Sequence, residues 1–166
     1  MRYADGPTTE VSIEIAAPPE AVWAVVTDPT IPAEHSQELQ SVVWDSEGPE
    51  PGLGARILGH NINPAVGEWR TSSVVTEWDA PNAWGYAVGD DPATAAALWR
   101  FTLVDAGDGS TTLTQHVRLG PGPSGLTPAI EAMPDKEERI ISKRLEFLNE
   151  NMTANLSAVK ALVEAE

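Results

Sequence analysis

The sequence predicts an α+β fold in which a curved antiparallel sheet of about six to seven strands wraps around one long C-terminal helix. Strand-like alternation of apolar and polar residues recurs between residues 11 and 119, and short turn segments separate the runs. About forty residues at the end of the chain change to helical spacing. A helix of about 30 residues is about 45 Å long, so only a whole sheet offers enough surface to cover its apolar side.

The N-terminal elements follow from alternation and from the placement of proline. Residues 11–15 alternate apolar and polar side chains, which predicts a half-buried strand. Residues 18–20, Pro-Pro-Glu, suit the start of a short helix, because proline fits a first helical turn and an acidic side chain there favours the helix dipole. A second helical turn is expected at residues 31–36. Residues 1–10 are expected to form a flexible tail and residues 11–166 a single domain, since a chain of this length is short for two.

The middle of the chain is rich in strands. Turn segments containing Gly, Pro, Asp and Asn separate runs that carry many Val, Ile, Thr and Trp residues, which suit a pleated surface. Because the connections are short, strands that follow one another are expected to pair antiparallel. The predicted strands are residues 40–44, 55–62, 68–78, 84–88, 98–104 and 111–119.

The C-terminal helix is defined by one apolar stripe. Its members are spaced by three or four residues: Ile141, Leu145, Leu148, Met152, Leu156, Val159 and Val163. Pro134 suits the first turn of this helix, and a separate helical turn is expected at residues 127–133.

Composition excludes several classes of function. The chain carries 25 acidic and 10 basic residues, a net charge of -15, so nucleic acid and an anionic membrane surface would be repelled. The absence of cysteine excludes disulfides, thiol catalysis and cysteine-ligated zinc. No apolar run approaches the length of a membrane span and no signal peptide is visible, so a cytoplasmic location without membrane insertion is expected.

Several segments resemble one known family. Residues 11–23 (VSIEIAAPPEAVW) resemble its opening strand, Ala-Pro corner and first helix, and residues 54–61 (GARILGHN) resemble a strand common in its bacterial members. Residues 69–78 and 99–103 resemble two further strands. The family is the START-like SRPBCC superfamily of helix-grip proteins, in particular its polyketide cyclase/dehydrase and lipid-transport group. The resemblance covers residues 11–163 and implies a cavity between sheet and helix, but the superfamily includes cyclases, hydrolases, lipid carriers and hormone receptors, so it specifies no chemistry.

Alternation along the strands predicts which side chains face that cavity. A mostly apolar wall with a few hydrogen-bonding groups is typical of a small-molecule site. The same aromatic side chains would serve equally in a packed core, and the resemblance is what favours a cavity. The expected ligand-binding residues are Asn61, Trp69, Thr71, Ser73, Trp84, Tyr86, Trp99, Phe101 and Gln115.

The candidate catalytic residues are His35, Glu34 and Tyr86. Histidine titrates near neutral pH, and His35 lies in the segment after the first helix. In an enzyme, Asn61 and Tyr86 would donate hydrogen bonds to an enolate oxygen, and Glu34 or His35 would act as the base. The other two histidines are expected on the outer face of the sheet. No metal-binding pattern is found, so we expect neither a metal nor a cofactor.

These observations favour a protein that binds a small hydrophobic molecule, lipid-like or polyketide-like, without a covalent step. The alternative is a polyketide cyclase, dehydratase or aromatase, which would need a buried titratable group beside the same cavity. A third hypothesis, a structural or regulatory partner protein, would require a filled interior and a large exposed apolar patch. The sequence leaves open whether the chain forms a homodimer and whether it catalyses a reaction.

Overall fold

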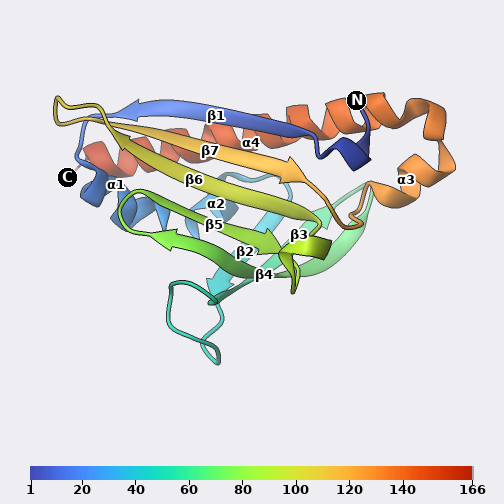
Figure 1. Cartoon of the computed structure of the whole chain (residues 1–166), viewed down its shortest axis with the longest axis horizontal. Coiled ribbons are helices and arrows are strands. Elements are labelled where there is room, and N and C mark those ends of the chain that lie inside the picture. The colour runs from blue at the N-terminus through green and yellow to red at the C-terminus, as the bar shows by residue number, and fades with distance from the viewer. Residues whose placement is uncertain (166) are drawn as a thin grey trace.

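A computed structural model describes residues 1–165 and confirms the predicted fold class. Within these residues, seven antiparallel strands form one sheet, and the chain ends in a long helix, α4 (Glu137–Glu164, 28 residues). Figure 1 shows α4 running nearly the length of the molecule, with the curved sheet beneath it. This is the architecture that the long apolar stripe predicted, because the sheet covers that stripe along most of its length.

Each predicted strand and helix is present, with bounds close to those expected. The strands are β1 (Thr8–Ile15), β2 (Leu39–Trp44), β3 (Arg56–Asn63), β4 (Gly67–Asp79), β5 (Ala83–Val88), β6 (Ala97–Asp105) and β7 (Thr111–Leu119). The shorter helices are α1 (Pro19–Val26), α2 (Ile31–His35) and α3 (Thr127–Ala132), with 3-10 turns η1 (Tyr3–Asp5), η2 (Pro92–Thr94) and η3 (Pro134–Lys136). The strand order is β1-β7-β6-β5-β4-β3-β2, so β1 and β2 form the two edges of the sheet.

The N-terminal segment differs from the flexible tail that was expected for residues 1–10. Strand β1 begins at Thr8, which pairs with Arg118 of β7. Tyr3 of η1 bonds to two distant parts of the chain. Its hydroxyl donates to the Gly122 carbonyl oxygen at 2.7 Å, and its backbone N–H donates to the Glu137 carboxylate at 2.9 Å. Residues 8–10 carry no large apolar side chain, so alternation gave no signal there.

A second difference lies at the start of the C-terminal helix. Pro134 belongs to η3, and α4 begins three residues later at Glu137. The acidic side chains of Glu137 and Glu138 occupy the first turn, where they favour the positive end of the helix dipole.

The sheet keeps a regular alternation except at two places, an irregularity between Leu39 and Ser41 of β2 and a bulge in β4. The register shifts between Val75 and Glu77, so Val75 and Trp78 both pack on the inner face. Glu77 then points outward, where the Arg100 Nε donates to its Oε1 at 2.7 Å.

The interior has one packed end and one open end. At the packed end, near α1, the last turns of α4 bury Leu156, Val159 and Val163 against aromatic residues of the sheet. The Trp84 and Phe101 rings stack there with centroids 5.2 Å apart and an interplanar angle of 8°. The first half of α4 buries Ile141, Leu148 and Met152 in a smaller apolar cluster and also borders a hollow, which holds the candidate site.

Candidate functional site

A cavity of about 560 Å³ lies between the concave face of the sheet and the first half of α4. Its volume falls within the range of small-molecule sites, roughly 300 to 1,000 Å³. The helix contributes residues from Arg144 to Asn155, and the opposite wall comes from inward side chains of the strands. The cavity argues against a filled interior, which the hypothesis of a structural partner protein required.

A glycine helps to make this space. Gly59 of β3 lies on the inner face next to β4, and a Cβ at this position would come within 2.5 Å of the Thr71 Oγ1. Any larger residue would therefore displace Thr71 or project into the cavity.

Seven of the nine side chains expected to contact a ligand line the cavity. They are Asn61, Trp69, Thr71, Ser73, Tyr86, Trp99 and Gln115. Trp84 and Phe101 lie on the same face of the sheet but in the packed end, each about 2% exposed. Alternation fixes which face a side chain occupies, but it does not fix its position along α4. Contact of the seven residues with a ligand stays a prediction.

The catalytic candidates separate into two groups. Tyr86 lines the cavity, together with Asn61. Glu34 and His35 are exposed on α2, because this short helix turns Ile31 into the core and its opposite side to solvent. The structure therefore does not place a base from α2 beside Tyr86.

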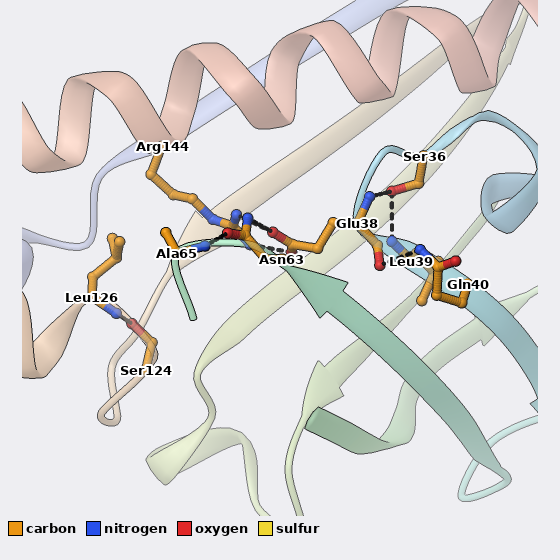
Figure 2. A network of polar contacts seen from close by, with 9 residues as sticks. All are labelled: Ser36, Glu38, Leu39, Gln40, Asn63, Ala65, Ser124, Leu126 and Arg144. Atoms are coloured by element: carbon orange, nitrogen blue, oxygen red, sulfur yellow. Dashed lines mark hydrogen bonds and ion pairs between the residues drawn. The ribbon is translucent and has the colours of Figure 1, made fainter. Parts of the chain in front are cut away.

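The charged pair on the cavity wall is Glu38 with Arg144, and the sequence analysis missed both residues. The Arg144 Nη1 and Nη2 each donate to one Glu38 carboxylate oxygen at 2.8 Å. The Asn63 Nδ2 donates to the Glu38 Oε2 at 3.0 Å. Figure 2 shows Arg144 reaching from α4 toward Glu38 and Asn63.

A sequence signal for Arg144 existed. It lies three residues after Ile141 and four before Leu148, and both of these belong to the apolar stripe. A charged residue at such a position must face the interior of the fold, where it needs a partner. Its partner Glu38 is 106 residues away along the chain, a distance that no local pattern bridges.

The electrostatics of this pair follow from its contacts. Burial raises the pKa of the Glu38 carboxyl, but the hydrogen bonds and charge of Arg144 and the hydrogen bond from Asn63 outweigh it, so the net pKa lies below the usual 4.5. Glu38 therefore stays ionised at neutral pH. A carboxylate held by two guanidinium bonds and an amide is a poor general base.

Two amide side chains meet deeper in the cavity. The Asn155 Nδ2 of α4 donates to the Gln115 Oε1 of β7 at 3.1 Å, and both residues line the wall. The Asn155 Oδ1 is buried and has no hydrogen-bond partner among the described residues.

Tyr86 adds a hydroxyl group to the same wall. Burial raises the pKa of the Tyr86 phenol, so it stays protonated at neutral pH. Its ring stacks on that of Trp99 with centroids 6.4 Å apart and an interplanar angle of 19°. The cavity thus combines aromatic surface with neutral hydrogen-bonding groups.

Two further features are absent from residues 1–165. No three His, Asp or Glu side chains come together as a metal ion would require. None of the helices described is both long and apolar enough to cross a membrane.

A curved antiparallel sheet that grips a long helix around a ligand-sized cavity defines a helix-grip protein. The chain belongs to the polyketide cyclase/dehydrase and lipid transport family, whose model matches residues 7–164. No curated protein matches the sequence.

Solved structures share this fold. A polyketide-cyclase-like protein of Corynebacterium glutamicum, Cgl2372, is 28% identical with a TM-score of 0.64, and the match covers 96% of this chain and 93% of that one. The Zhui aromatase/cyclase of Streptomyces sp. R1128 is 18% identical, covering 95% and 93%, with a TM-score of 0.63. The di-domain aromatase/cyclase BexL, from the BE-7585A biosynthetic pathway, is 18% identical with a TM-score of 0.69. That match covers 96% of this chain and 50% of BexL, so this chain spans about half the length of BexL.

Proposed function

We propose that this protein binds a small, largely apolar molecule that carries hydrogen-bonding groups, and holds it in the cavity without covalent chemistry. The observation that carries the proposal is the cavity of about 560 Å³, whose wall is mostly apolar with a few polar side chains, among them Asn61, Ser73 and Tyr86. This size and this mixture of groups are typical of small-molecule sites.

The apolar part of the ligand would contact aromatic and aliphatic side chains. Trp69 and Trp99 of the sheet face Leu148 and Met152 of α4 across the cavity. Flat aromatic side chains offer large contact areas, and methionine adapts to irregular shapes. Both properties suit a ring system or a branched hydrocarbon.

Binding without reaction fits the titratable groups better than catalysis does. The carboxylate on the wall, Glu38, is held by Arg144, and the expected bases Glu34 and His35 lie on the exposed side of α2. A cyclase or dehydratase would need a base free to take a proton. The observation that favours this second function is the neutral phenol of Tyr86, which would serve as a donor to a ligand carbonyl. The aromatase/cyclases among the structural neighbours give it a precedent in fold alone.

Two measurements test the proposal. Native mass spectrometry of the purified protein should show a co-purifying small molecule, and the neutral dye N-phenylnaphthylamine should gain fluorescence when the protein is added. Thr71→Trp, which fills the cavity from β4, should abolish the dye signal. Arg70→Trp places the same ring on the outer face of the same strand and should leave the signal intact. The proposal fails if the wild-type protein neither carries a molecule nor binds the dye, or if the two variants behave alike.

A further inference from the structure

We propose that the cavity accepts uncharged ligands, and that Glu38 excludes anionic ones by occupying Arg144. This inference rests on the proposed binding function and names the class of ligand for it. In this inference, Glu38 alone makes the cavity prefer uncharged ligands to anionic ones.

The Arg144 guanidinium is already bound within the protein. Among the described residues that line the cavity, Arg144 is the one cation. Both of its terminal nitrogens donate to Glu38 at 2.8 Å, in the paired geometry that a ligand carboxylate would otherwise adopt. The Arg144 Cζ also lies over the Phe147 ring, 5.3 Å from the ring centroid. An anionic ligand would therefore meet a guanidinium whose two terminal nitrogens already bind a carboxylate.

The position of the pair makes it relevant to any ligand that enters. Glu38 immediately precedes β2, and Asn63 ends β3, so the pair joins this corner of the sheet to α4 (Figure 2). Val66 lies on the same wall and is 60% exposed, so the cavity meets solvent at this end. The Arg144 side chain is 27% exposed and the Glu38 side chain 9%, which places the carboxylate on the inner side of the pair.

The energetics then favour neutral molecules. An anion that enters the cavity gives up its hydration and meets a guanidinium that is already neutralised, together with the carboxylate of Glu38 itself. The net charge of -15 on the chain adds a further repulsion. Removing the charge of Glu38 would free the Arg144 fork, which binds carboxylates and sulfonates readily.

Two dyes with one carbon skeleton test this inference. N-phenylnaphthylamine is neutral, and anilinonaphthalene sulfonate carries an added sulfonate. The wild-type protein should bind the neutral dye at least about tenfold more tightly, the equivalent of one buried charge-assisted hydrogen bond. Glu38→Gln should raise the affinity for the sulfonate about tenfold and leave the neutral dye nearly unchanged.

Two further variants separate a local effect from a general one. Glu38→Gln with Arg144→Gln removes the freed cation as well, so the gain in sulfonate affinity should disappear. Glu34→Gln makes the same change of net charge on the exposed side of α2 and should give no gain. An equal gain in Glu34→Gln would show that net charge, and not Arg144, sets the preference, and would overturn the inference.

The outcomes distinguish this inference from the proposed function. If the wild-type protein binds neither dye and carries no co-purifying molecule, the proposed function fails. If it binds both dyes equally, or if Glu38→Gln folds and leaves their ratio unchanged, the cavity binds ligands but Glu38 does not select them. Should Glu38→Gln fail to fold, the wild-type ratio of the two affinities is compared at low salt and at about 1 M salt, because salt screens the repulsion from the net charge much more than a local contact. A preference for the neutral dye that disappears at high salt would assign the selection to net charge and overturn the inference.

Discussion

The Asn155 amide nitrogen donates to the Gln115 carbonyl oxygen at 3.1 Å, and this bond joins α4 to β7 inside the cavity. It lies between the packed end of the interior and the open end. The pair connects α4 to the sheet at the boundary between the packed aromatic residues and the cavity. It also presents a polar surface to whatever occupies that space.

The first prediction concerns this amide. Asn155→Leu keeps the side-chain size but removes the polar atoms, so it should reduce the advantage of naphthol over naphthalene by about fivefold, the worth of one neutral hydrogen bond. Competition against N-phenylnaphthylamine measures both affinities. Ser157→Leu, two residues on and exposed, is the matched control and should change neither. An unchanged naphthol advantage in Asn155→Leu would show that this amide does not contact ligands.

A second prediction concerns the Tyr86 phenol. Burial raises its pKa, and ionisation is then disfavoured in the folded state, so folding stability should fall as pH rises above the ordinary tyrosine value of about 10. The chain has two tyrosines, so subtracting the ultraviolet titration of Tyr86→Phe from that of the wild type isolates this one. Its ionisation should occur above the ordinary range and coincide with unfolding. A group that titrates at about pH 10 with the fold intact would show that the phenol is solvated inside the cavity.

The third prediction uses the ion pair at the cavity end. Glu38→Gln should lower the free energy of unfolding by about 2 kcal/mol near pH 7, because it leaves Arg144 without its charged partner. The folded pKa of Glu38 lies below 4.5, so the wild-type advantage is present above that pH and is lost as pH falls through the lowered value. Urea unfolding at neutral and acidic pH measures the difference between the two proteins.

Two controls sharpen this measurement. Arg144 from α4 and Asn63 from β3 are the groups that hold the carboxylate, so Asn63→Ala should reproduce part of the loss. Glu34→Gln on the surface should change stability by less than about 0.5 kcal/mol. A Glu38→Gln deficit that stays constant down to acidic pH would mean that packing, and not charge, accounts for it.

The sequence predicted most of the wall of the site but not its charged pair. Alternation placed Asn61, Thr71 and Gln115 correctly, because a regular strand leaves little choice of face. It placed Trp84 beside them although that residue lies in the packed end, since the period of a strand says nothing about depth along α4. The role of Glu38 could not be predicted from the sequence, because it lies outside the strands, just before β2. Its partner Arg144 is 106 residues away along the chain and comes near it only in the folded protein.

The last prediction follows from the contrast between the two ends of the interior. Phe101→Ala removes a ring that is 2% exposed and stacked on Trp84, so it should cost about 3 to 5 kcal/mol of stability. Trp69→Ala removes a half-buried ring from the cavity wall, where open space already exists, so it should cost less stability but weaken dye binding more. Thermal unfolding and N-phenylnaphthylamine titration of both variants give the comparison. If Phe101→Ala weakened dye binding more than Trp69→Ala while remaining folded, the cavity would extend into the end that now looks packed. Trp84 and Phe101 would then contact the ligand. The distinction between one end of the interior that stabilises the fold and another that binds the ligand would be wrong.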